Sequence, residues 1–413
     1  MKLSIIICVY NTAKEYLTEC LESITRSTVK QLNGGYEICM VDDGSSIDYS
    51  ELVSKYGIKY LKTENCGILS ARRTGVQIAE GEYIVFCDSD DTVSHNYHMP
   101  MVECAEKSSA DIVINDWAFY TPNMKYYCTN DETIRKNIDA VKGDTLLLFM
   151  KNRGRQHSFY VLWNKLYKAE LLRKSLESLF GAGYPLNASY AEDAAINFFA
   201  WKYAKRVINI HTGFYFYRIH PSQTVNAASE ERLLSQIEDM SECFKIMRSN
   251  IEDEPHKEKI EEDLDAWISL MSRAHFATAS ANGYKNLFPK IQELYNTQKL
   301  KMPIFKDSSD YLAKTLLGIN FTEVDAALLS LWDSDEIIKV SYRKKDTYTA
   351  RCVDYLAEHE KVLKANLQNA DIAIPKLRYP LKQRILHNKY VYALGLLLFK
   401  KGSKIRGLLK KMV

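Results

Sequence analysis

Short apolar runs alternate with amphipathic segments over the N-terminal part of the chain. The runs are rich in β-branched residues and predict strands at 3–9, 36–41, 58–61, 82–87 and 111–115. The segments between them have apolar residues at helical spacing and predict helices at 13–27, 49–56, 68–79 and 97–107. This alternation of strand and helix predicts an α/β fold built on a doubly wound, mostly parallel sheet.

The pattern changes further along the chain. Residues 116–226 combine short apolar runs at 207–210 and 214–217 with a helical pattern at 191–203, and we expect them to complete a domain of residues 1–228. Beyond this point the spacing is helical, at 233–247, 260–271, 328–332 and 353–367. The prediction is a mainly helical domain at 229–371, which ends in a tail at 372–413.

The tail carries most of the charge asymmetry of the chain. The 413 residues have a net charge of only +3, but residues 372–413 contain 11 Lys and Arg and no acid, so the rest is acidic. Ile405, Leu408, Leu409 and Met412 follow helical spacing among these basic residues. We expect a basic amphipathic helix that lies on an anionic membrane surface. The alternative is a helix packed on the domain or between copies of the chain. No nucleic-acid motif accompanies the charge.

Composition and cysteine usage narrow the class of protein. With 46% apolar and 26% charged residues the chain is globular, which excludes a disordered or fibrous protein. The nine cysteines are scattered, and Cys8, Cys39 and Cys87 lie in apolar runs, which favours reduced thiols over disulfides or a zinc site. We find no signal peptide and no apolar stretch long enough to span a membrane. These features predict a cytoplasmic protein, held peripherally on the membrane by the tail.

Polar residues follow the first four predicted strands, where a doubly wound sheet binds its ligands. These segments are Tyr10-Asn11, Asp42-Asp43-Gly44-Ser45, Glu64-Asn65-Cys66-Gly67 and Asp88-Ser89-Asp90-Asp91. Paired carboxylates at a strand end are suited to a Mg²⁺ or Mn²⁺ ion that also binds substrate phosphate and water. Ordinary turn and capping chemistry is the alternative, since Asp and Ser are favoured in both places.

Cationic and capping residues complement these acids. Asn65 is placed to cap the helix at 68–79, whose N-terminal amides would attract an anion. Arg72 lies on that helix and is within reach of a diphosphate or a base. The alternative is that Arg72 and Arg73 are surface arginines, and we expect this of at least one of them.

These motifs together resemble the inverting family 2 glycosyltransferases of bacterial surface polysaccharide synthesis, which have the GT-A nucleotide-sugar-binding fold. The resemblance extends from Ile5 to about Val225 and includes the opening strand that ends at Val9-Tyr10-Asn11, the acidic turns at Asp42 and Asp88, the segment Ala71-Arg72-Arg73-Thr74-Gly75 and the pair Glu192-Asp193. Cys8 departs from it, because the family usually has proline there.

The resemblance implies a role for each motif. Tyr10, flanked by Val9 and Asn11, would pack near the base of a UDP-sugar, and Asp42 would accept a hydrogen bond from the uracil imide. Arg72 and Asn65 would lie beside the nucleotide, with Asp88 and Ser89 at the ribose. Asp90 would bind Mn²⁺ or Mg²⁺, and His220 is a candidate third ligand or a donor to the diphosphate. The alternative for His220 is a structural role. Asp193 would be the general base of a single in-line displacement.

Further residues belong to the acceptor or leaving-group side of this resemblance. They are Glu192, Asn164, Lys165 and Arg218. Ser189 and Glu192 have the spacing of a capping box, which would turn Glu192 back to the helix and leave Asp193 available as base. Trp163 is either part of this acceptor segment or a core residue at the joint before the next helix. The basic loop at 151–157 would be a lid or an acceptor phosphate contact; otherwise it is a solvated loop.

The prediction is a metal-dependent hexosyl- or N-acetylhexosaminyltransferase that acts on a lipid-linked or oligosaccharide acceptor. A nucleotidyltransferase is the alternative enzyme, but no glycine-rich basic loop follows the first strand. A degenerate transferase that assembles a membrane complex is the alternative from another class. The intact Asp42, Asp88, Asp90 and Asp193 argue against it.

Overall fold

The first apolar run forms a strand whose side chains are buried on both sides of a sheet. Ile5 and Ile7 point to one face and Ile6 to the other, and all three are at most 1% exposed. A strand covered on both faces is typical of a parallel sheet in an α/β fold. The computed structural model describes residues 1–120, 126–128, 138–152, 157–218, 229–281, 284 and 286–295.

The elements follow the predicted alternation. The first part of the chain forms β1 (Leu3–Val9), α1 (Lys14–Thr25), the 3-10 helix η1 (Thr28–Gln31), β2 (Tyr36–Asp43), α2 (Ser50–Tyr56), β3 (Lys59–Thr63), α3 (Ile68–Ile78), β4 (Tyr83–Phe86), β5 (Thr92–Val93), α4 (His98–Ser108) and β6 (Ile112–Tyr120). The second part forms β7 (Tyr126–Cys128), β8 (Asp139–Val141), α5 (Thr145–Asn152), α6 (His157–Tyr160), β9 (Lys165–Lys168), α7 (Ala169–Gly181), α8 (Glu192–Tyr203), β10 (Arg206–Arg218), α9 (Glu230–Ser249), α10 (Lys257–Ala281) and α11 (Leu287–Tyr295).

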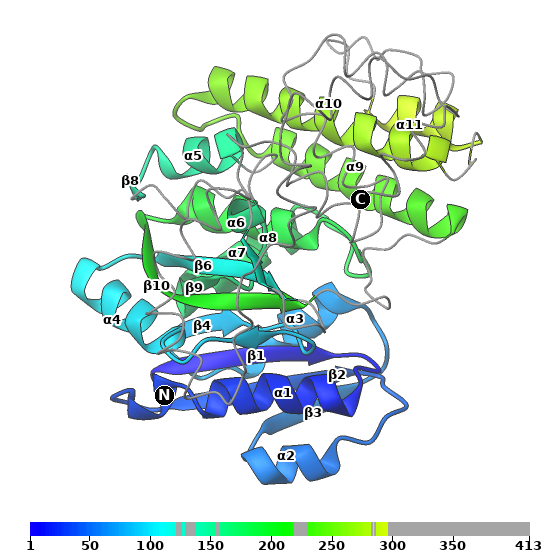
Figure 1. Cartoon of the computed structure of the whole chain (residues 1–413). Coiled ribbons are helices and arrows are strands. Elements are labelled where there is room, and N and C mark those ends of the chain that lie inside the picture. Colours follow the sequence, from blue (N-terminus) through cyan, green and yellow to red (C-terminus); the bar gives the residue numbers. More distant parts are fainter. Residues whose placement is uncertain are drawn as a thin grey trace, which may run out of the picture.

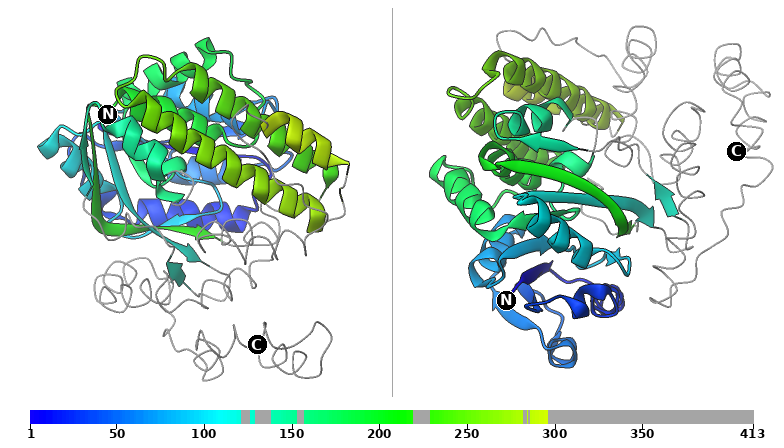
Figure 2. Two further views of the ribbon diagram at one scale, coloured as in Figure 1. Left: turned by 90° about the horizontal axis from the view of Figure 1, so that it is seen from above. Right: turned by 90° about the vertical axis from the view of Figure 1, so that its left-hand side faces the viewer.

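The sheet is mostly parallel and doubly wound, as predicted. Its strand order is β3-β2-β1-β4-β9-β6-β10-β5, and β1 pairs in parallel with both β2 and β4. β9 is antiparallel to its neighbours β4 and β6, and β10 runs parallel to β6. The two strands predicted at 207–210 and 214–217 are in fact one strand, β10, whose register with β6 shifts between Asn209 and Phe214. Figure 2 shows this long strand curving beside β6.

Helices cover both faces of the sheet. One face packs against α1 and α4, and the other against α3, α7 and α8. The hydrophobic core on the face of α3, α7 and α8 continues into α9, α10 and α11. These three helices lie at the end of the molecule opposite α2 (Figure 1). Trp267 of α10 contacts Phe149 of α5 and Phe244 of α9, with ring centroids 6.4 and 5.2 Å apart. The predicted helices at 233–247 and 260–271 are confirmed, and those at 328–332 and 353–367 lie outside the described residues, as does the tail.

Two further expectations concern the oxidation state of the cysteines and the presence of a membrane-spanning helix. The seven cysteines whose side chains the structure describes are all unbridged. Among the described residues, no helix combines the length and the apolar character that a membrane crossing needs.

A buried histidine in this fold leads to a prediction about acid stability. His98 of α4 is 1% exposed, neither ring nitrogen has a hydrogen-bond partner, and burial lowers its pKa from 6.5 to about 3. The unfolded chain takes up a proton below pH 6.5 that the folded chain refuses, so the free energy of unfolding falls as the pH falls below 6.5. From pH 6.5 to 5.0 we expect His98 alone to lower it by about 2 kcal/mol.

Replacing His98 by Phe tests this expectation. The variant keeps a ring against Tyr97, whose centroid lies 5.0 Å away, and removes the titrating group. Urea unfolding at pH 7.5 and 5.0 should show a smaller loss of stability in the variant than in the wild type. An equal loss in both would mean that His98 is not the acid-sensitive group.

Candidate active site

Three turns at the carboxyl edge of the sheet are joined by hydrogen bonds. The turn after β1 meets the turn after β2, because Asn11 N donates to Ser45 Oγ at 2.9 Å and Asn11 Oδ1 accepts from Ser46 N at 2.8 Å. The turn after β4 joins them through Thr12 Oγ1 and Ser89 Oγ, 2.7 Å apart. The structure therefore brings the residues predicted from three separate strand ends to one place.

Asp42 is held as a buried carboxylate at this edge. It is fully buried, and its oxygens accept hydrogen bonds from Ser45 N and from the Tyr60 hydroxyl, both at 2.7 Å. Burial alone would raise its pKa, but these hydrogen bonds and the charge of Lys62 outweigh it and lower the pKa. Gly44 permits the turn, since its φ is +81° and a Cβ would lie 2.8 Å from Asn65 N. Tyr60 lies in β3 and was not among the residues predicted for the site.

Asp43 has a structural task in the same turn. Its two carboxylate oxygens accept from Cys66 N at 2.8 Å and Gly67 N at 2.9 Å, directly before α3. The prediction that Asn65 caps α3 is wrong, because the cap residue is Gly67 and no side chain caps it. The carboxylate of Asp43 accepts hydrogen bonds from the amides of Cys66 and Gly67 instead. The side chain of Asn65 is exposed.

Arg72 lies between acids from two sides of the site. It is 5% exposed, and its guanidinium donates to Glu192 Oε1 at 2.6 Å and to Asp193 Oδ1. Asp88 Oδ1 lies 3.6 Å from its other terminal nitrogen. The charges of Asp193, Glu192 and Asp88 raise the pKa of Arg72 despite its burial. Arg72 therefore joins the strand end of β4 to the start of α8.

Two of the acids around Arg72 have raised pKa values. Burial, reinforced by neighbouring carboxylates, raises the pKa of Asp88 and that of Glu192 to about 7 each, although Arg72 opposes both shifts. Raised carboxyl pKa values in one place are typical of catalytic sites. One cation among three acids also leaves an excess of negative charge, which favours a further cation or a proton there.

The predicted capping box at the start of α8 is absent. The helix begins at Glu192, after Ala191 in the left-handed region with φ +62°, and no side chain caps it. Ser189 N donates instead to Asp239 Oδ2, at 2.9 Å. Glu192 faces Arg72. Asp193 also accepts from Leu162 N at 3.3 Å, and its side chain is 18% exposed against 11% for Glu192.

Asp88, Ser89, Asp90 and Asp91 form a loop that β10 holds in place. Asp91 is 1% exposed and accepts from the Tyr215 hydroxyl and from Arg218 N, both at 2.7 Å. Arg218 is 3% exposed, and its Nε donates to Asp90 O at 2.6 Å. The rest of its guanidinium contacts Glu19 and lies over the Tyr16 ring. These contacts make Arg218 an anchor of the loop.

Other predicted site residues take different positions. Tyr10 is 55% exposed and Val9 is buried beneath it in β1. Asn164 and Lys165 are fully buried, and Lys165 Nζ donates to Asn164 Oδ1 at 2.9 Å, so the expectation that they face an acceptor is wrong. Trp163 is a core residue, 3% exposed. His220 and residues 153–156 of the basic loop lie outside the described residues.

Asp88 and Asp90 fit the needs of a hard divalent cation. Both are partly exposed at the strand end, and both supply carboxylate oxygens. Within the described residues no three His, Cys, Asp or Glu side chains are grouped as a complete metal site. Mg²⁺ and Mn²⁺ are commonly held by one or two carboxylates and complete their shells with substrate phosphate and water.

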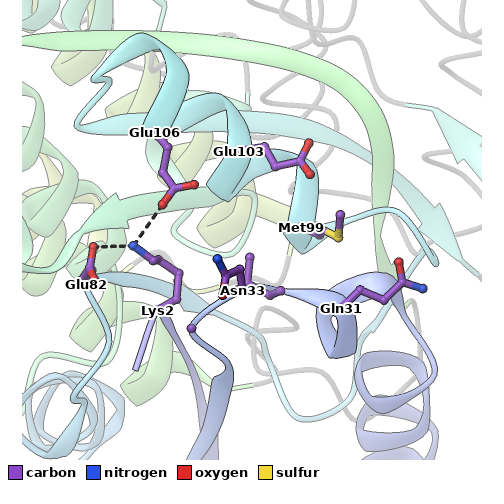
Figure 3. Close-up of a pocket in the computed structure, with 9 residues that line it drawn as sticks. Lys2, Gln31, Asn33, Glu82, Met99, Glu103 and Glu106 are labelled. Carbon is purple, nitrogen blue, oxygen red and sulfur yellow. Dashed lines mark hydrogen bonds and ion pairs between the residues drawn. The ribbon is translucent and has the colours of Figure 1, made fainter.

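A cavity of about 460 Å³ lies at the opposite edge of the sheet, where β1 and β4 begin (Figure 3). Lys2 lines it, and its Nζ is paired with Glu82 at 2.7 Å and Glu106 at 3.0 Å. Its lining includes none of the predicted site residues. The candidate site is therefore the carboxyl edge.

The sequence of this region matches a known family. Residues 4–176, which include the turns at Asp42 and Asp88 and the helix of Arg72, match the model described as glycosyl transferase family 2. This match assigns residues 4–176 to a family 2 glycosyltransferase domain. Glu192 and Asp193 lie beyond the end of this match at residue 176, and both contact Arg72 inside it.

Two relatives and one solved structure extend the comparison. The chain is 27% identical to EpsH of Bacillus subtilis (strain 168) over 70% of its length and 81% of EpsH. It is 25% identical to a poly(ribitol-phosphate) beta-glucosyltransferase of Bacillus spizizenii over 84% of its length, but covers only 57% of that protein. The crystal structure of S. aureus TarS 1–349 in complex with UDP has a similar fold, with 18% identity and a TM-score of 0.50, over 95% of this chain and 92% of TarS 1–349.

Proposed function

We propose that this family 2 glycosyltransferase transfers a sugar from a UDP-sugar with inversion, in a metal-dependent reaction. The observation that carries the proposal is the buried Arg72, which joins Asp88 on the donor side to Asp193 on the acceptor side. A site that must bring a leaving diphosphate and an attacking hydroxyl together needs such a link between its halves.

On the donor side, the base would lie against the exposed ring of Tyr10. Asp42 would read the uracil imide, because its carboxylate is kept ionised and a carboxylate accepts an N–H hydrogen bond. The two oxygens of Asp42 already accept from Ser45 N and from the Tyr60 hydroxyl, so the imide would use a further lone pair of one of them. The UDP in the TarS complex is a property of that protein, and here it supports the choice of uridine.

At the ribose and diphosphate, Asp88 and Ser89 would hold the ribose while Asp90 and Asp88 face the metal position. A divalent cation bound there supplies charge that stabilises the leaving diphosphate. His220 is the proposed third ligand. Arg72 supplies fixed positive charge beside Asp88.

In the transfer step, the acceptor hydroxyl oxygen attacks the anomeric carbon as the bond from that carbon to the diphosphate oxygen breaks. Asp193 takes the hydroxyl proton and UDP leaves with the bonding electrons, so the configuration at the anomeric carbon inverts. Leu162 N and Arg72 hold the carboxylate of Asp193 in orientation. Glu192, buried beside it, keeps Arg72 in place.

The acceptor is proposed to be a lipid-linked or oligosaccharide glycan in polysaccharide synthesis. One relative is named as a poly(ribitol-phosphate) beta-glucosyltransferase, and this name supports a polymeric acceptor. The basic tail at 372–413 would bring the enzyme to the inner face of the membrane, where lipid-linked acceptors lie.

Titration calorimetry with UDP, GDP and CMP, each with Mn²⁺ and with chelator, tests the donor assignment. We expect UDP alone to bind with Mn²⁺ and to bind at least tenfold more weakly with chelator, because its diphosphate then faces the acids directly. Asp42→Ala should weaken UDP binding, whereas Asp139→Ala, an exposed acid on β8, should not. Equal binding of the three nucleotides would refute the uridine assignment.

A further inference from the structure

The Tyr215 hydroxyl touches the candidate metal loop at two places. It accepts a hydrogen bond from Asp88 N at 2.9 Å and donates to Asp91 Oδ2 at 2.7 Å. Tyr215 and Asp91 are 0% and 1% exposed, so water does not compete for these bonds. One hydroxyl therefore fixes the first and the last residue of the loop that contains Asp90.

The direction of these bonds follows from proton counting. A tyrosine hydroxyl has a single proton. Because Asp88 N already donates to the oxygen, that proton points to the carboxylate of Asp91. The other oxygen of Asp91 accepts from Arg218 N at 2.7 Å. Asp91 thus uses both oxygens in bonds to β10, whereas Asp88 Oδ1 lies 3.6 Å from the Arg72 guanidinium in the candidate site.

The Tyr215 ring is itself held in place. It stacks on Trp163, with centroids 4.4 Å apart and ring planes at 15°, and Trp163 meets Trp117 edge to face at 5.0 Å. Tyr215 also pairs with Val93 through the short antiparallel ladder of β10 and β5. The hydroxyl consequently has a fixed position from which it can set the geometry of the loop.

We propose that Tyr215, acting through Asp91, is a positioning residue that holds Asp88 and Asp90 in the arrangement required by the metal and the diphosphate. The proposal rests on the proposed function for the identity of the ligand. It assigns no contact with substrate to Tyr215. The third acid of Asp88-Ser89-Asp90-Asp91 is, on this view, an anchor and not a ligand.

The main test is Tyr215→Phe, which keeps the ring stack and removes only the hydroxyl. Tyr203→Phe is the matched control: it removes a hydroxyl bonded to Ser178 Oγ at 3.0 Å, at the far end of α8. Two readouts are needed, amide hydrogen exchange of residues 87–93 without ligand, and calorimetry of UDP with Mn²⁺ and with chelator.

In Tyr215→Phe we expect the Asp88 amide to exchange about tenfold faster and UDP to bind about tenfold more weakly with Mn²⁺, with little change in chelator. Tyr203→Phe should match the wild type in both. Unchanged exchange and binding in Tyr215→Phe would overturn the proposal and leave the proposed function intact. A wild type that binds no UDP would refute the proposed function, and with it the role toward a metal.

Asp91→Asn adds a second variant of the same hydrogen bond. Asparagine has one acceptor oxygen where Asp91 has two, so either the Tyr215 hydroxyl or Arg218 N would face its NH2 group, and the loop should loosen as in Tyr215→Phe. If both residues act through one hydrogen bond, the double variant will bind UDP no more weakly than the weaker single variant. Additive losses would show two separate roles and would overturn the proposal.

Discussion

Asp193→Asn is expected to lower the rate of sugar transfer by about three orders of magnitude and to leave UDP binding unchanged. Asparagine has the shape of aspartate and still accepts from Leu162 N, but it cannot take up the acceptor proton. General base catalysis contributes about 10²–10⁴ in rate, and this variant removes it. The measurement is transfer or hydrolysis of a UDP-sugar, alongside calorimetry with UDP.

Glu192→Gln is the matched neighbour for this experiment. It contacts the same guanidinium, but its side chain is less exposed, so we expect a smaller loss of rate. If Glu192→Gln abolished transfer while Asp193→Asn retained it, the base would be Glu192. The result also separates an enzyme from an assembly module. Lost activity with UDP binding preserved excludes the module, and full activity in Asp193→Asn would exclude Asp193 as base.

The strand-end positions could be predicted from sequence because they depend on local pattern and on one topological rule. Tyr10, Asp42 and Asp88 follow apolar runs, and neighbouring parallel strands bring their carboxyl ends together. The order of the elements and their type are enough to predict the fold class and the edge of the sheet at which the acids gather.

Contacts between distant segments could not be read in the same way. Tyr60 and Tyr215 come from β3 and β10, and each acts through one hydroxyl whose partner depends on strand register. The prediction for Glu192 failed because Ala191 takes a left-handed conformation and α8 begins two residues later than a capping box at Ser189 requires. Asn164 and Lys165 are a further case, since the resemblance placed them on the acceptor or leaving-group side, whereas the structure buries both side chains completely.

Arg72→Met is expected to destabilise the fold by about 3–5 kcal/mol at pH 7.5, because it leaves buried acids without their cation. Methionine keeps an unbranched chain of similar length and so limits the loss of packing. Arg248→Met is the control. It breaks a more exposed pair with Asp265, and such a pair is worth at most about 1 kcal/mol. Urea unfolding of both variants provides the comparison.

The pH dependence of Arg72→Met identifies the cause of its instability. Arg72 now opposes the rise in the pKa of Asp88 and Glu192, so without it both pKa values rise above about 7. The folded variant then keeps these two carboxyl groups protonated at a pH where the unfolded chain has them ionised. In the unfolded chain they take up protons only near their ordinary pKa of about 4. Its stability deficit relative to the wild type should therefore shrink between pH 8 and 5.5. Glu192→Gln should partly rescue Arg72→Met by removing one unpaired charge. A deficit that is constant with pH and insensitive to Glu192→Gln would mean that Arg72 stabilises the site by packing alone.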